Sequence, residues 1–266
     1  MQTVNLSPEL YGKIVDCAAL RTKDLLALCL TCKAFQRAAE IRLYNHVALS
    51  EPQQTIDGCC TLIQNGRLAQ HVRGFWFNPD ARTCSSLEHD FWGMIRRALI
   101  ACQNMEALLI SDPTFTNTWV LDCPEFTFRL REAKLRFVYD ENIIHFLESQ
   151  PAIRMLHIYD FADDDILHTI RPNSLPLLET FDGTLSVGGQ FIPSKLCHLQ
   201  MVIDCDMEFS LQLLPQLSLL RKNLRSLSLL DVPSEMSLPA LDIVSQVLPN
   251  IRHLGLFPYP VNAVSN

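Results

Sequence analysis

The chain has 266 residues, of which 48% are hydrophobic and 19% are charged, and its formal net charge at pH 7 is −7. So large an apolar fraction excludes a disordered chain and predicts a well-buried interior. The acidic balance argues against nucleic-acid binding, because phosphate contacts need clustered Lys and Arg side chains. The length suits one large domain, or a small module followed by a larger one.

Ten cysteines could indicate disulfides or a zinc site, but only Cys29 and Cys32 have the spacing of paired metal ligands, and no second such pair follows. We therefore expect reduced, buried thiols, with no metal and no other cofactor. The opening residues, MQTVNLSPEL, lack the basic and apolar regions of a secretion signal. No run approaches the roughly 18 apolar residues of a membrane span. These features predict an intracellular protein, cytoplasmic or nuclear, that has no membrane partner.

The first fifty residues predict three short helices. Ser7 and Pro8 are typical of a helix start, and apolar residues follow at helical spacing. A second helix from about Lys23, capped by Thr22, is apolar almost all round, and a third spans about Lys33 to Tyr44. A module this small cannot bury so much apolar surface alone, and an exposed apolar patch usually marks a partner surface. The sequence thus predicts that a partner completes the core.

This part of the chain resembles the F-box: it reads LSPELYGKIVDCAALRTKDLLALCLTCKAFQRAAEIRLYNHV. The family pattern runs Leu-Pro-x-Glu-Leu, then Ile, then a Leu-rich second helix that ends near Cys-Lys-x-Phe. Ser7 departs from it, since the family often has its first proline there. The resemblance implies docking on a Skp-type adaptor and, through it, on a cullin–RING ubiquitin ligase; an ordinary helical hairpin is the alternative. The residues implied to bind the adaptor are Leu6, Pro8, Glu9, Leu10, Ile14, Leu25, Leu28, Cys32 and Phe35.

The rest of the chain repeats a six-residue pattern, L-x-x-L-x-L with substitutions. Most of the repeats are separated by close to the roughly 20–29 residues of leucine-rich repeats, and helical stretches precede several of them. Helix and strand in alternation predict a parallel sheet with helices outside it. Each unit buries its face only against its neighbours, which describes a solenoid. The pattern occurs at 72–77, 105–110, 132–137, 153–158, 178–183, 196–201, 224–229 and 251–256.

The expected fold class is α/β: a small N-terminal three-helix F-box over residues 1–50, followed by an irregular leucine-rich-repeat-like α/β solenoid with a parallel sheet over 51–266. This architecture resembles that of fungal F-box proteins with degenerate leucine-rich repeats. The tail after the last repeat, PYPVNAVSN, is short, and its prolines cannot donate to a strand ladder. We expect an exposed sheet edge after Phe257.

Catalytic motifs are missing from the sequence: there is no P-loop, H-E-x-x-H, G-x-S-x-G or EF-hand loop. Gly188-Gly189-Gln190 is more typical of a flexible loop than of a peptide-release motif. Asp163-Asp164-Asp165 lacks the spacing and glycine of a calcium loop. Cys197-His198 falls in a predicted strand, where neighbouring side chains point to opposite faces. We therefore expect no enzymatic activity and no catalytic residue.

The residues that flank the central leucine of each repeat should point to the open, concave face. Interfaces favour aromatic and Arg anchors, so this face is a candidate for substrate binding, with a merely solvated face as the alternative. The sequence predicts a substrate-recognition subunit of an SCF-type ubiquitin ligase with an unidentified protein substrate. An F-box scaffold outside a ligase and an unrecognised enzyme are the other two interpretations. The candidate substrate-binding residues are Trp76, Leu109, Lys134, Arg136 and His157.

Overall fold

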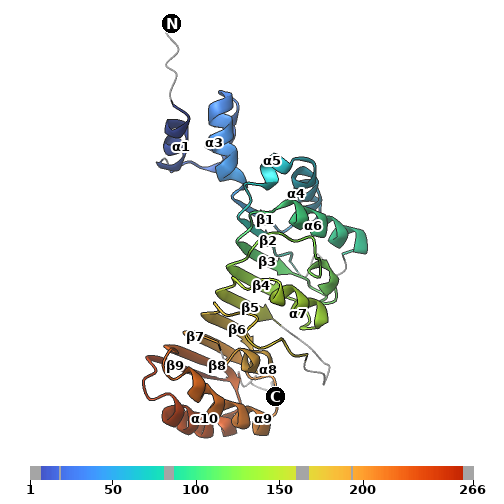
Figure 1. The fold of residues 1–266 in the computed structure, drawn as a ribbon. Helices are drawn as coiled ribbons and strands as arrows, with labels where there is room; N and C mark the ends of the chain where they lie inside the picture. The colour runs from blue at the N-terminus through green and yellow to red at the C-terminus, as the bar shows by residue number, and fades with distance from the viewer. Residues whose placement is uncertain (1–6, 18, 81–86, 160–167, 193, 260–266) are drawn as a thin grey trace, which may run out of the picture. The chain divides into compact units, whose positions relative to one another are not determined.

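The computed structural model of the protein describes residues 7–17, 19–80, 87–159, 168–192 and 194–259 (Figure 1). The fold is mixed α/β, with ten α-helices and nine strands among these residues. It divides into two compact units: unit 1 is residues 1–113 with 124–128, and unit 2 is residues 114–123 with 129–266. The functional division at residues 50 and 51 stays a prediction.

Unit 1 has three helices followed by alternating strands and helices. Its strands β1, β2 and β3 pair in parallel, and Phe75 lies in register with Val47 and Leu108. The strand β1 was not predicted from the sequence. Leu49 is its only buried residue, and the six-residue pattern does not occur there. The elements are α1 (Pro8–Cys17), α2 (Thr22–Cys29), α3 (Lys33–Tyr44), β1 (His46–Leu49), α4 (Pro52–Gln64), α5 (Gly66–Ala69), β2 (Gly74–Phe77), α6 (His89–Ala101) and β3 (Ala107–Ser111).

The three N-terminal helices lie where the sequence predicts them. Helix α1 begins at Pro8, and α3 has the predicted bounds. Helix α2 differs by one residue: Thr22 is its first residue rather than its cap, and the Asp24 carboxylate accepts a hydrogen bond from the Arg21 amide at 3.0 Å. The apolar faces meet in a small core. Its buried residues are Val15, Leu25 and Ala39, against which Leu20, Leu28, Cys29, Phe35, Ala38 and Leu43 pack.

A buried carboxylate ties this helical module to the rest of unit 1. Glu40 of α3 is only 8% exposed. Its two oxygens accept hydrogen bonds from both terminal nitrogens of Arg67 in α5, and Gln36 adds a third at 2.9 Å. The Arg67 guanidinium lowers the pKa of Glu40 despite the opposing effect of burial. The ion pair is therefore a fixed connection between α3 and α5.

Unit 2 repeats strand and helix along the chain. Figure 1 shows its strands in chain order from β4 to β9, and the pairs within the unit are all parallel. The elements are η1 (Thr118–Val120), β4 (Glu132–Arg136), α7 (Glu141–Glu148), β5 (Met155–Tyr159), β6 (Thr180–Thr184), α8 (Leu185–Gly188), η2 (Gly189–Phe191), β7 (His198–Val202), α9 (Met207–Leu213), η3 (Leu214–Leu220), β8 (Ser226–Val232), α10 (Ser234–Val247) and β9 (His253–Pro258).

All eight segments with the six-residue pattern contain a strand, from β2 to β9. One of them was placed two residues too late. Ala133, and not Leu135, lies in register with Leu156, so the pattern begins at the buried Leu130 rather than at Glu132. The sequence is ambiguous here because apolar residues alternate without a break from Ala133 through Leu135 to Phe137.

The register is fixed by one carbonyl before each strand, which we call the pre-strand position. The Cys197 carbonyl accepts hydrogen bonds from the amides of Arg225 at 2.8 Å and Ser226 at 3.2 Å. The Arg225 carbonyl accepts from Arg252 at 3.0 Å and His253 at 3.1 Å. The pre-strand residues are Asn45, Arg73 and Glu106 in unit 1 and Arg131, Arg154, Glu179, Cys197, Arg225 and Arg252 in unit 2.

The flexible loop expected at Gly188 and Gly189 is instead the junction of α8 and η2. A Cβ at Gly188 would lie 2.9 Å from the Phe181 ring, and one at Gly189 would lie 2.6 Å from Leu213. Both glycines therefore serve close packing, because a larger residue would collide with the buried layer.

Exposure at the last strand begins earlier than the sequence predicts. In β9 Leu254 is already 37% exposed, whereas the equivalent Leu227 of β8 is fully buried. Phe257 is 53% exposed. Among the described residues only β8 pairs with β9, so the apolar residues of β9 have neighbours on one side alone.

The described cysteines are free thiols that range from buried to exposed. Burial raises the pKa of Cys59 and of Cys102 to about 12, as expected for thiols inside the protein. Cys17 and Cys32 are exposed, so the expectation of uniformly buried thiols is wrong for them. In the part of the chain that the structure describes, no helix combines the length and apolarity needed to cross a membrane.

The ion pair between the buried Glu40 carboxylate and the half-exposed Arg67 predicts a pH-dependent stability. The folded-state pKa of Glu40 lies below its ordinary value of 4.5, so the pair stabilises above that value and is lost as the pH falls through the folded pKa. Glu40→Gln should lower the free energy of unfolding by about 1–2 kcal/mol at pH 7, with a smaller gap at pH 3. Urea titrations at both pH values measure this.

Glu179→Gln is the matched control, because the pair between Arg154 and Glu179 is about half exposed at both ends. It should cost less than about 0.5 kcal/mol at pH 7. Equal losses for the two variants, or a Glu40→Gln loss that is the same at pH 3 and pH 7, would contradict this account.

Candidate functional site

The residues with the F-box-like pattern divide into core and surface. Leu25 is 5% exposed and belongs to the core of the helical module, whereas Leu10 and Ile14 of α1 are each 43% exposed. Leu28 and Phe35 are partly buried against that core, and Phe35 meets the Tyr11 ring edge-on at 4.7 Å. Leu10 and Ile14 are thus available for contact with another molecule, while Leu25 is not.

The remaining predicted residues lie at helix starts or outside the described residues. Glu9 is exposed in the first turn of α1, which begins at Pro8. Cys32 is the exposed N-cap of α3, where the Phe35 amide lowers the pKa of its thiol. Leu6 lies outside the described residues.

Three further apolar side chains of the module are exposed, and the sequence pattern did not single them out. Leu26 and Leu30 of the second helical segment are 54% and 89% exposed, and Ile41 of α3 is 51% exposed. The apolar character of α2 on all sides was the available signal, because so short a helix can bury only one side in a three-helix core. Together with Leu10 and Ile14 they are the exposed apolar side chains of the module, which we call its apolar surface.

In unit 1 the open face of the sheet carries Trp76. This residue is 41% exposed, while Phe75 and Phe77 on either side of it are fully buried. Its ring lies 5.3 Å from the His46 ring on β1, and Leu109 is its register partner on β3. Trp76 and the half-buried Leu109 therefore share one apolar area on the face predicted for them.

In unit 2 the predicted Lys134, Arg136 and His157 lie on the open face of β4 and β5. Lys134 is the register partner of His157, and Arg136 that of Tyr159. Both cations have local partners: the Lys134 ammonium lies 2.9 Å from a Glu132 oxygen, and the Arg136 guanidinium lies 4.8 Å from the centre of the Phe115 ring. These contacts orient the two cations and reduce the charge available to a ligand.

A hydrogen-bonded row crosses three strands beside these cations. His157 Nδ1 lies 3.1 Å from Asp182 on β6, and the Gln200 amide of β7 donates to the other Asp182 oxygen at 2.9 Å. The Tyr159 ring packs against the imidazole at a centroid distance of 4.1 Å. Only His157 of this row was among the predicted site residues, because hydrogen bonds across strands depend on register.

Burial lowers the pKa of His157; the Asp182 carboxylate opposes this effect and Lys134 adds to it. The imidazole is therefore neutral at pH 7, and the tautomer that fits carries its proton on Nδ1, facing Asp182. Nε2 is buried and has no hydrogen-bond partner among the described residues. A His–carboxylate pair can act as a base only if Nε2 reaches a nucleophile or a substrate proton. Here it fixes a polar area on the open face.

Tyr159 and Phe115 are functional candidates that sequence reasoning missed. Tyr159 follows the last apolar residue of its six-residue pattern, so the pattern does not assign it a face. Phe115 lies in a segment before η1 with a positive φ of 62°. Extending the two-residue alternation of β5 by one residue would have placed Tyr159 on the open face, whereas nothing in the sequence indicates Phe115.

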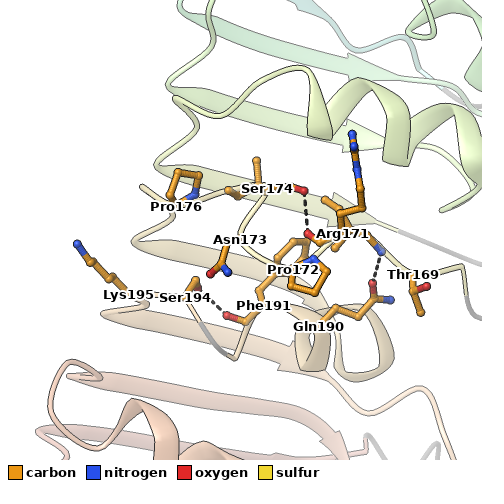
Figure 2. A pocket seen from close by; sticks show the side chains of 12 residues that line it. Thr169, Arg171, Pro172, Asn173, Ser174, Pro176, Gln190, Phe191, Ser194 and Lys195 are labelled. Atoms are coloured by element: carbon orange, nitrogen blue, oxygen red, sulfur yellow. Dashed lines mark hydrogen bonds between the residues drawn. The ribbon is translucent and has the colours of Figure 1, made fainter.

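A pocket of about 380 Å³ in unit 2 is lined by residues 169–176 and by Gln190, Phe191, Ser194 and Lys195. Figure 2 shows these side chains. Two of its polar side chains are bound within the protein. The Gln190 side-chain amide accepts from the Ile170 backbone amide and donates to the His168 carbonyl, each at 2.9 Å. Arg171 at its rim binds Glu148 at 2.7 Å. The aspartates at 163–165 lie outside the described residues.

No protein-family model matches the chain, and no curated protein matches its sequence significantly. The resemblance to the F-box and to leucine-rich repeats therefore depends on the residue patterns described above.

Titration of His157 tests the arrangement on the open face. Asp182→Asn removes the charge that raises the pKa of His157, so that pKa should fall further below its ordinary value of 6.5. Lys134→Met removes the cation that lowers it, so the pKa should rise. Histidine ring signals followed by NMR between pH 4 and pH 8 measure both. Shifts in the same direction for the two variants would refute the geometry.

Proposed function

We propose that this protein is a substrate-recognition subunit of an SCF-type ubiquitin ligase. In this proposal the N-terminal helices act as an F-box and bind a Skp-type adaptor, and the repeat body is a leucine-rich-repeat-like solenoid that binds a protein substrate. The chain contributes proximity and no chemistry: it holds the substrate near the ligase and so raises its local concentration.

The observation that carries the proposal is the apolar surface of the module. Leu10 and Ile14 occupy positions of the F-box-like pattern and are exposed, whereas Leu25 of the same pattern fills the core. Single exposed apolar side chains are common on any protein, but here five lie on a module of three short helices. An exposed apolar surface beside a small core supports a partner surface, and the pattern supports the adaptor as that partner.

The open face supports the second half of the proposal. In unit 1 it offers the apolar pair Trp76 and Leu109, and in unit 2 it offers Arg136, Tyr159 and the His157 row. Trp, Tyr and Arg are the residues that most often anchor protein interfaces. The aromatic residues should carry more of the affinity than the charged ones, because exposed ion pairs contribute little.

Adaptor binding is the first test. Leu10→Ala with Ile14→Ala should weaken binding to a purified Skp-type adaptor by about 2 kcal/mol or more for each anchor. Isothermal titration calorimetry measures the affinity, and circular dichroism verifies the fold. The control is Leu219→Ala with Leu238→Ala in unit 2, whose side chains are 69% and 77% exposed. An adaptor affinity unchanged by the first pair, or reduced equally by both, rules out this surface.

Substrate capture is the second test. Trp76→Ala and Arg136→Glu, each alone, should deplete the set of proteins that copurify with the chain when the proteasome is blocked, while adaptor and cullin are retained. Arg97→Glu on α6 is the control for charge. Affinity purification with mass spectrometry provides the comparison. Recovery of the adaptor without a cullin would favour a scaffold outside a ligase, and full retention of every partner by both variants would exclude the open face.

A further inference from the structure

The side chains at the pre-strand positions of unit 2 form a column at the beginning of the strands. Neighbouring strands lie about 4.8 Å apart, so side chains at consecutive pre-strand positions are close enough to interact. Where opposite charges are adjacent they pair, as Arg154 does with Glu179 at 3.0 Å. Unit 1 has the same arrangement between Arg73 and Glu106, at 3.3 Å. In both units, opposite charges at adjacent pre-strand positions thus form ion pairs.

The last positions of the column in unit 2 differ in having no acidic neighbour. Arg131 and Arg154 are also adjacent, but Arg154 pairs with Glu179 on its other side. Cys197 is neutral, and Arg225 and Arg252 follow on the next two strands. The Arg252 amide donates to the Arg225 carbonyl at 3.0 Å, so the two arginines occupy adjacent places in the ladder. Like charges at adjacent positions destabilise a sheet. This arrangement costs stability unless a negative charge compensates it.

Two more cations lie at the same place. Arg221 and Lys222 belong to the turn between η3 and β8, and all four cations are exposed. Within the described part of the chain none of the four forms an ion pair with a carboxylate. Together they line a cleft of about 630 Å³, completed by Cys197, Asn223, Leu224 and Asn250. In a chain of net charge −7, so local a positive cluster is a specific feature.

We propose that this basic cleft binds a compact ligand that carries two or more phosphate groups. Arg guanidinium groups hold phosphate oxygens with paired hydrogen bonds, Lys adds a further charge, and the amides of Asn223 and Asn250 supply neutral donors. Four cations exceed what one phosphate would neutralise, which favours a ligand with several. The cleft volume lies within the roughly 300–1,000 Å³ typical of small-molecule sites. The proposal is independent of adaptor and substrate binding.

Sodium tripolyphosphate is the probe, added to the full-length protein in a calorimetric titration. We expect saturable binding to one site that weakens as salt is added. Arg225→Gln with Arg252→Gln should reduce the affinity roughly a hundredfold, since each charge-assisted contact typically accounts for about tenfold or more. The matched control is Arg73→Gln with Arg154→Gln, which removes the same charge from the paired pre-strand positions. The affinity of this control for the probe should lie within about twofold of the wild-type affinity, because its two arginines are in exposed ion pairs that contribute little to stability.

Thermal melting distinguishes loss of binding from loss of folding. Without the probe, the Arg225→Gln and Arg252→Gln variant should melt at the wild-type temperature or above it, because the repulsion is relieved. With the probe only wild type and the control should be stabilised. If the double variant fails to fold, Arg221→Gln with Lys222→Gln in the preceding turn tests the same cleft. Absence of binding to wild type, or equal loss in variant and control, would overturn the proposal.

The same phosphate chemistry occurs in solution and on lipid headgroups. Phosphatidylcholine vesicles with a bisphosphorylated inositol lipid separate the two sources. Vesicle retention that tripolyphosphate displaces would place the ligand on a headgroup, and tripolyphosphate binding without vesicle retention would place it in solution. Either result supports the basic cleft as the binding site if the Arg225→Gln and Arg252→Gln variant loses that binding.

Discussion

The strands of this protein depend on the carbonyls at the pre-strand positions, seven of which accept two amides at the start of the strand that follows. This contact fixes where the next strand begins, and the two-residue period of the strand then fixes every side chain on it. Phe181, Leu199 and Leu227 thereby lie in one buried layer. His157, Asp182 and Gln200 lie in one row on the opposite face. The buried layer and the polar row follow from the same register.

The strands could be predicted from the sequence because their buried residues recur with a constant internal spacing. The pattern failed where it could be placed on the sequence in two ways. At β4, a placement with Leu130 and Ala133 and a placement with Leu135 and Phe137 fit almost equally well. It also failed at Gly188, because a glycine enclosed by Phe181 and Met201 has the same sequence signature as a glycine in a loop. Close approach of backbone to side chain is a tertiary property that no local pattern contains.

The candidate surfaces were predictable to different extents. Alternation along a strand placed Trp76 and Lys134 on the open face, since it needs only the strand itself. The contacts that set their chemistry join distant parts of the chain: Phe115 under Arg136, and Asp182 beside His157. The basic cleft was missed for another reason. A leucine-centred pattern treats the residue before each strand as variable, so Arg225 and Arg252 carry no signal in it. A comparison of the residues before successive strands would have shown that these two arginines follow one another without an acidic residue between them.

The buried thiols give each unit an internal reporter of its own opening. A thiol reacts as its thiolate, so Cys59 and Cys102, with a pKa of about 12, are protected both by burial and by protonation while unit 1 is closed. Cys123 is likewise enclosed in unit 2. The rate at which an alkylating reagent modifies each cysteine under native conditions therefore measures how often the surrounding unit opens. Mass spectrometry of the labelled peptides would show whether the two units open together or independently.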